Sequence, residues 1–114
     1  MTAFAIASES VSLAGAEATL LRLAFGEPAT NDAIVREADR TMRELKGESL
    51  RGGRLVLLHG PASLAAVAVI VHHIAHLFGA VAVFDPKLNG YVVVVSHDPA
   101  FRIGDVLPET GEAR

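Results

Sequence analysis

Hydrophobic and polar positions in the first quarter of the chain predict a hairpin. Residues 4–13 and 18–24 alternate or run apolar on either side of Gly15, as two strands joined by a short turn do. A helix is expected next, because N-cap residue types at 30–32 precede apolar residues at helical spacing up to Gly47. Its apolar positions are Ile34, Ala38, Met42 and Leu45.

The remaining positions of this helix carry a basic stripe of Arg36, Arg40 and Arg43, which alternates with acidic residues. Opposite charges three or four positions apart stabilise an exposed helix. We therefore interpret the stripe as a solvated face.

The middle of the chain, residues 55–84, contains no Asp, Glu, Lys or Arg. Residues 54–59 form a continuous apolar run typical of a strand buried on both faces, and residues 80–84 predict a second one. Residues 62–78 predict a helix between them, so the segment forms a parallel β-α-β unit. A membrane-spanning helix is not favoured, because four histidines and three Gly or Pro residues divide the stretch.

The last part of the chain predicts an antiparallel return. Residues 85–90 carry turn chemistry, and the β-branched segment 91–95 folds back as a strand. Residues 101–107 are expected to add a short edge piece, and residues 108–114 a flexible tail. The predicted fold is a single α/β domain over residues 1–107, with a small mixed sheet, two helices and the order β-β-α-β-α-β-β.

Composition narrows the chemistry. A chain of 114 residues, 51% of them hydrophobic, fits one globular domain. The absence of cysteine excludes disulfides, thiolate metal centres and a cysteine nucleophile. A net charge of −3 does not indicate affinity for duplex DNA or an anionic membrane. The N-terminus lacks the pattern of a secretion signal, which favours a cytoplasmic location.

Histidines in the second predicted helix offer candidate chemistry. On a helical wheel, His72, His73 and His76 fall on an arc away from the predicted core face. Spacings of three or four residues can bring two imidazoles to one metal ion. Two ligands make a weak site, and a subunit interface or exposure to water explains the arc more simply. The predicted core face consists of Leu64, Val67, Ile70, Val71, Ile74 and Phe78.

Two further polar residues follow predicted strands. Asp85 ends one strand and His97 ends its hairpin partner, and α/β folds place their sites at strand ends beside helices. Together with His76 they offer one carboxylate and two imidazoles, a set that suits manganese, and zinc or iron less specifically. The alternatives stay open, because an Asp before proline also forms turns and a polar residue also terminates strands.

Gly60, Pro61 and Ser63 lie between the first buried strand and the second helix. A strand, a glycine turn and a helix start point backbone N–H groups at a ligand, which favours phosphate. No Gly-Lys-Ser/Thr follows, so this is not a Walker loop, and packing alone also explains such a turn.

Residues 55–107 carry a series of motifs in a specific order and spacing: Gly60-Pro61, a helix bearing His73 and His76, the segment 81–88, Gly90, the segment 92–94, Ser96-His97 and Gly104-Asp105-Val106. By these motifs the segment resembles the CRISPR-associated Csx-three (Crn-three) family of ring nucleases. The first half of the chain matches only in its general order of hairpin, helix and strand.

The resemblance implies a relative of the CRISPR-associated Rossmann fold that binds cyclic tetra-adenylate, the second messenger of type III CRISPR defence. It implies cleavage of this ring to linear oligoadenylates with manganese. In that family the ring is sandwiched between protein molecules that complete the active site together, so the resemblance implies a homo-oligomer. The implied catalytic residues are His76, Asp85, Lys87 and His97, the implied metal ligands His76, Asp85 and His97, and the expected ligand-binding residues Gly60, Pro61, Ser63 and His73.

Two departures from the family pattern keep an alternative open. Lys87 stands where the family has arginine, and lysine lacks the planar fork that grips phosphate bidentately. The second helix is also about one turn longer between Gly60 and Asp85. A non-catalytic protein that binds and sequesters cyclic oligoadenylate is therefore the alternative function.

Overall fold

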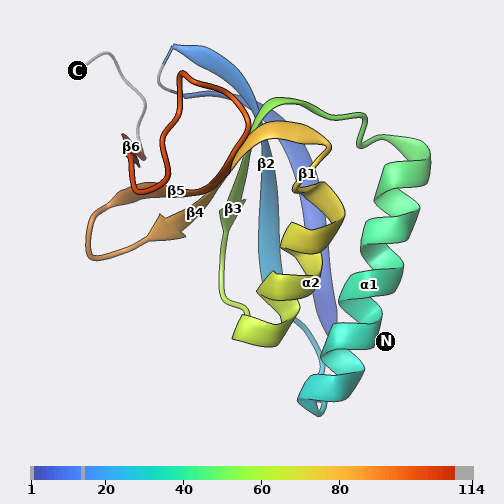
Figure 1. The fold of residues 1–114 in the computed structure, drawn as a ribbon. Helices are drawn as coiled ribbons and strands as arrows, with labels where there is room; N and C mark the ends of the chain where they lie inside the picture. The colour runs from blue at the N-terminus through green and yellow to red at the C-terminus, as the bar shows by residue number, and fades with distance from the viewer. Residues whose placement is uncertain (1, 14, 110–114) are drawn as a thin grey trace.

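The computed structural model describes residues 2–13 and 15–109, which form one six-stranded sheet and two helices (Figure 1). Strands β2, β3 and β4 run parallel, and the other neighbouring pairs run antiparallel. The predicted small α/β fold with a mixed sheet is confirmed. The elements are β1 (Phe4–Leu13), β2 (Ala16–Phe25), α1 (Asn31–Glu48), β3 (Gly53–His59), α2 (Leu64–Ile74), β4 (Phe78–Asp85), β5 (Gly90–Ser96) and β6 (Val106–Pro108).

A Rossmann-like strand order is not confirmed. A doubly wound sheet reverses its strand order at a switch point and carries helices on both faces. Here the strands lie in consecutive order from β1 to β6, so the described sheet contains no such reversal. Both helices pack side by side against the same face, as Figure 1 shows.

The helix-covered face of the sheet holds the first of two hydrophobic clusters. Its members from the helices are Ile34, Ala38, Met42, Ala66, Ile70 and Ile74. They pack against Phe4, Leu21, Val56 and Val81 from four strands. Each large side chain buried here stabilises the fold by about 1.5–3 kcal/mol. The predicted apolar stripe of α1 is confirmed, with Leu45 only partly buried.

The second cluster covers the opposite face of the sheet. Phe101 and Leu107, from the segment that follows β5, pack against Leu55, Leu57 and Val93. Strand β3 is therefore buried on both faces, which confirms the interpretation of its continuous apolar run.

Helix α2 is shorter than the sequence predicts. The pattern predicts a helix over residues 62–78, but α2 ends at Ile74 and β4 already begins at Phe78. Phe78 pairs with Gly53 and is buried in the helix-side cluster, so the chain must turn at residues 75–77. His76 consequently lies in a turn, and Leu64, expected in the core, is 91% exposed. No helix in the described ranges is long and apolar enough to cross a membrane.

Strand β6 supplies the predicted edge piece, with Val106 paired to Val92. Pro108 is its last residue, and the Glu109 N–H donates to the Asn89 carbonyl at 3.2 Å. The start of the predicted tail therefore contacts the β4–β5 turn. The rest of that tail, residues 110–114, lies outside the described residues.

Candidate functional site

The predicted catalytic residues lie at opposite ends of the sheet. Strands β4 and β5 are antiparallel, with Asp85 paired to Gly90 at one end and Ala80 paired to Ser96 at the other. His97 follows Ser96, so five residues of β4, about 17 Å, separate it from Asp85. We call the end with Gly60, Asp85 and Lys87 the carboxyl edge, and the end with His76 and His97 the histidine edge.

Within one chain, the structure does not bring Asp85 together with His76 and His97. A hairpin reverses the chain, so the end of its second strand lies beside the start of the first. Among the described residues, no group of three His, Cys, Asp or Glu side chains could hold a metal ion.

Gly60 has a structural reason for its identity at the carboxyl edge. Its φ is +125°, and a Cβ at this position would lie 2.1 Å from the Leu23 carbonyl oxygen of β2. Only glycine allows this approach. The packing interpretation of the turn is therefore sufficient for Gly60, while the exposed backbone beside Pro61 faces solvent.

Ser63 connects the two helices at the same edge. Its Oγ accepts the Ala66 N–H at 3.1 Å, which caps α2, and donates to Asn31 Oδ1 at 2.8 Å at the start of α1. The N-termini of both helices therefore lie together. The first turn of α2 carries no acidic residue. No side-chain carboxylate of this turn therefore neutralises the partial positive charge of the helix N-terminus, which can attract an anion.

A cavity of about 280 Å³ adjoins the Gly60 turn. Its walls are mostly apolar and come from the ends of β2, β3 and β4 and from α2. They consist of Leu23, Leu58, His59, Gly60, Pro61, Val67, Val83, Phe84 and Pro86. A cavity of this size and lining accommodates a small, largely apolar group.

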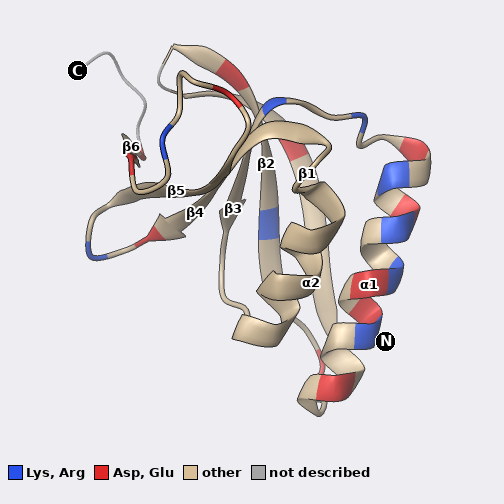
Figure 2. Cartoon of the chain, viewed as in Figure 1, with Lys and Arg blue, Asp and Glu red and all other residues tan. Residues whose placement is uncertain are grey.

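Asp85 acts as a turn former in the structure. Its Oδ1 accepts the Lys87 N–H at 2.8 Å and the Leu88 N–H at 3.3 Å. This confirms the turn interpretation of the Asp-Pro pair. Lys87 is exposed in the turn between β4 and β5, a region where Figure 2 shows a basic segment near an acidic one.

The histidine edge brings two imidazoles together. The rings of His76 and His97 stack with centroids 5.1 Å apart and planes 26° apart. His97 Nε2 lies 3.0 Å from the Ala75 carbonyl, and its backbone N–H donates to the Gly79 carbonyl at 2.7 Å. Because a carbonyl oxygen only accepts, Nε2 carries the hydrogen in this bond, which leaves Nδ1 of the neutral ring as an acceptor.

The turn after His97 contains a residue that the sequence analysis missed. Asp98 Oδ1 accepts the Ala100 N–H at 2.8 Å, and its Oδ2 lies 3.0 Å from Arg54 Nε. These two contacts hold the pKa of Asp98 below its usual range. The Asp98-Pro99 pair carries the same turn signal as Asp85-Pro86 and could have identified this residue.

His73 contacts neither edge. Its Nε2 lies 2.7 Å from Asp39 Oδ1 on α1, and its side chain is only 8% exposed, so it does not share an exposed arc with its neighbours. The hydrogen bond with His73, assisted by Arg43, holds the pKa of Asp39 below its usual range. His72 is exposed to solvent, as the simpler interpretation of the arc predicts.

His59 is a second residue that the sequence analysis left unassigned. Its ring lies 4.1 Å from Phe84 and 5.9 Å from Tyr91, and its Nε2 is 3.8 Å from Glu109 Oε2. It lines the 280 Å³ cavity. It is the last residue of the buried strand β3, as Asp85 is the last residue of β4. The strand-end argument applied to Asp85 would have identified it as well.

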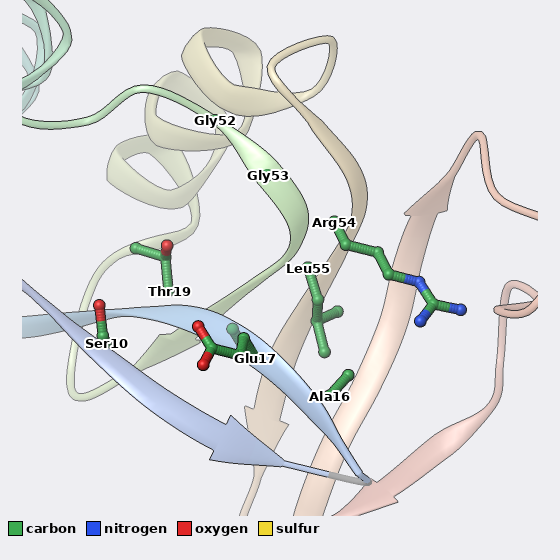
Figure 3. Close-up of a pocket in the computed structure, with 9 residues that line it drawn as sticks. Ser10, Ala16, Glu17, Thr19, Gly52, Gly53, Arg54 and Leu55 are labelled. Atoms are coloured by element: carbon green, nitrogen blue, oxygen red, sulfur yellow. The ribbon is translucent and has the colours of Figure 1, made fainter.

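A more polar hollow of about 420 Å³ lies between β1, β2 and the start of β3 (Figure 3). Figure 3 shows Ser10, Glu17 and Thr19 on one side and Gly52-Gly53 on the other. None of the predicted site residues lines this hollow. The side chain of Arg54 extends away from Ser10 and Thr19, in keeping with its contact with Asp98.

The fold and the two edges define a small α/β protein with polar groups at both ends of its parallel strands. The family model described as CRISPR-associated protein (Cas_csx3) matches residues 30–108. This is more than half of the chain, which therefore belongs to that family. The match includes both edges. No curated protein and no solved structure matches the chain significantly.

Proposed function

We propose that this protein is a ring nuclease that binds cyclic tetra-adenylate between two copies of the chain and cleaves it to linear oligoadenylates. Membership of a CRISPR-associated family supports this role. One observation carries it: Asp85 and Lys87 lie at one end of the sheet, while His76 and His97 lie at the other. Two copies stacked head to tail would bring one edge of each copy to the same ligand.

The carboxyl edge has the features that a nucleotide needs. The start of α2 and the backbone at Gly60 favour phosphate, and the Lys87 ammonium adds a positive charge. The adjoining apolar cavity of about 280 Å³ suits an adenine base. Backbone contacts and burial would therefore supply most of the binding at this edge.

The histidine edge has the features that proton transfer needs. The free Nδ1 of His97 accepts the proton of a ribose 2′-OH, whose oxygen attacks the adjacent phosphorus. Lys87 of the second copy stabilises the negative charge that develops on the phosphate oxygens. Protonated His76 donates its proton to the leaving 5′-oxygen, so the products carry a 2′,3′-cyclic phosphate and a 5′-OH.

Manganese dependence is a separate part of the proposal. Within the described residues of one chain, the expected ligands do not fit a metal site, because Asp85 is remote from the two imidazoles. Metal binding would require Asp85 from one copy and histidines from another. None of the steps above uses a metal, so cleavage in chelator compared with added manganese tests this part alone.

Mixing two inactive variants tests whether the active site is composite. Lys87→Ala removes the cation of the carboxyl edge and His97→Ala removes the base of the histidine edge, so at saturating ligand each variant alone should be nearly inactive. In an equal mixture, about a quarter of the head-to-tail contacts join two intact edges. We expect cleavage to return to about that fraction of the wild-type rate. A mixture as inactive as its components would contradict a site shared between copies.

A binding protein that sequesters the ring is the second candidate. It is favoured by the hydrogen bonds that already engage Asp85 Oδ1 and by the lysine at position 87. Wild-type protein incubated with excess cyclic tetra-adenylate separates the two functions. Turnover beyond one equivalent supports the nuclease, whereas tight binding of intact ligand supports sequestration. Absence of binding rejects both.

A further inference from the structure

The position of His97 is fixed by contacts with two neighbouring segments. Its backbone N–H donates to Gly79 at the start of β4, and its ring contacts Ala75 and His76 in the turn after α2. The side chain itself is exposed. Its orientation therefore depends on how firmly the end of β5 is held against these neighbours.

The residues on both sides of His97 are tightly bonded. The Ser96 Oγ lies 2.9 Å from the Asp98 carbonyl and 2.6 Å from the Phe101 carbonyl. It also accepts the Asp98 N–H at 3.2 Å. The Phe101 N–H donates to the Asp98 carbonyl at 3.0 Å, so residues 96–101 form a compact turn.

Arg54 joins this turn to β3. Its Nε lies 3.0 Å from Asp98 Oδ2, and its guanidinium carbon lies 5.2 Å from the centre of the Phe101 ring. Arg54 therefore contacts Asp98 within the turn and Phe101 at its end. A Cβ at Gly79 would lie 2.9 Å from the Arg54 carbonyl and 3.5 Å from Asp98 Cβ, which shows how closely these segments pack.

An exposed ion pair contributes little to the stability of a fold. The Arg54 side chain is 54% exposed, yet it connects β3 to the residue that directly follows His97. From this geometry we propose that Arg54 and Asp98 are positioning residues, which hold His97 with its Nε2–H on the Ala75 carbonyl and its Nδ1 directed at the ligand. The expected effect of these residues on cleavage rests on the proposed nuclease function. Their expected effect on the orientation of the His97 ring does not.

Histidine NMR on the ligand-free protein tests the structural part. At mildly alkaline pH, where imidazoles are neutral, long-range proton–nitrogen spectra distinguish the two ring tautomers. We expect His97 to be a single Nε2–H tautomer in the wild type and a mixture of both tautomers in Arg54→Gln and Asp98→Asn. The His97 signal is identified as the one that disappears from the spectrum of His97→Gln. Arg43→Gln is the matched control, because Arg43 Nε also lies 3.0 Å from an Asp Oδ2, on α1.

Cleavage kinetics test the catalytic part. We expect kcat to fall about tenfold or more in Arg54→Gln with KM nearly unchanged, because misplacing a catalytic group impairs reaction more than binding. Arg54→Lys, which keeps the charge, should recover part of the rate and guards against a variant that fails to fold. Unchanged tautomer and rate in both Arg54→Gln and Asp98→Asn would overturn the proposal, and so would a lost rate with an unchanged tautomer. If the wild type does not cleave the ring but the variants change the tautomer of His97, the positioning role is supported and the proposed nuclease function is rejected.

Discussion

Asp85 combines two properties that can be separated by one substitution. Its Oδ1 organises the β4–β5 turn by accepting two backbone N–H groups. Its negative charge is what a proton-transfer or metal-binding role requires. An asparagine keeps the acceptor oxygen and removes the charge, so it distinguishes a turn former from a catalytic group.

We expect Asp85→Asn to lower the manganese-stimulated part of the cleavage rate about a hundredfold, while folding, ligand binding and cleavage in chelator persist. Single-turnover cleavage and thermal unfolding measure the two properties. His72→Ala is the control, because this exposed residue belongs to neither edge. A wild-type rate in Asp85→Asn would leave Asp85 with its structural role only.

Lys87 provides a point charge without the planar fork of an arginine. Lys87→Ala should weaken both binding and cleavage, because a cation beside phosphate stabilises the bound ligand as well as the transition state. Lys87→Arg should raise the rate by restoring bidentate contact. Equilibrium binding and initial rates measured on both variants check these directions, and a faster Lys87→Ala would contradict them.

At the scale of elements, the contact between α1 and α2 depends on Asp39 and His73. The hydrogen bond from His73 lowers the pKa of Asp39 from its usual 3.8, so the folded state favours the ionised carboxylate. This contribution is fully present above the unfolded pKa and is lost as pH falls through the lower folded value.

We expect the stability advantage of the wild type over Asp39→Asn to be constant near neutral pH and to disappear below about pH 4. Urea unfolding at a series of acidic pH values measures it. His73→Gln removes the principal cause of the lowered pKa and should reduce the same acid-sensitive difference. An advantage that persists at the lowest pH would rule out this linkage.

Glycine at position 60 is required by the packing of β3 against β2. Gly60→Ala should destabilise the fold by about 2 kcal/mol or more, since it adds a close contact with the Leu23 carbonyl to a strained φ. Gly15→Ala is the control, because Gly15 has a φ of +75° but no atom within 4 Å of an added Cβ. Gly15→Ala should lower the free energy of unfolding by only about 1 kcal/mol. Chemical denaturation without ligand compares the two, and equal losses would show that the contact is unimportant.

Most elements could be predicted because their patterns are local. The helix predicted from apolar spacing corresponds to α1, and the strand predicted from the continuous apolar run corresponds to β3. The boundaries of both elements differ from the prediction by one or two residues. The end of α2 could not be predicted in this way, since residues 75–78 continue the apolar pattern without a breaker. The pairing of Phe78 with Gly53, a contact between distant residues, decides where the helix stops.

At the scale of the whole molecule, the arrangement of the site depends on topology more than on residue identity. Asp85 ends β4 and His97 directly follows β5, in keeping with the strand ends that the sequence indicates, but the hairpin places them at opposite ends of the sheet. The Arg54–Asp98 contact was likewise missed, because its partners are 44 positions apart and join two different strand ends. Sequence patterns identify candidate residues, whereas their grouping requires the three-dimensional register.

The position of the two edges also predicts how copies assemble. A head-to-tail contact uses different surfaces on each partner, so every copy keeps one unused edge and growth can continue. We therefore expect cyclic tetra-adenylate to drive the wild type into species larger than a dimer, with size increasing with protein concentration. Analytical ultracentrifugation with and without the ligand measures this.

Edge-specific variants make this assembly prediction sharper. Lys87→Glu places a negative charge beside the phosphates at the carboxyl edge, and His97→Asp does so at the histidine edge. Each variant alone lacks one of the two surfaces, so neither should associate when ligand is added. An equal mixture retains a single type of intact contact, between the histidine edge of Lys87→Glu and the carboxyl edge of His97→Asp. Assembly should therefore stop at a pair containing one copy of each. A wild type that stays monomeric with ligand would contradict the sandwich, and ligand-driven growth beyond a pair in the mixture would show that copies also associate through a surface other than these edges.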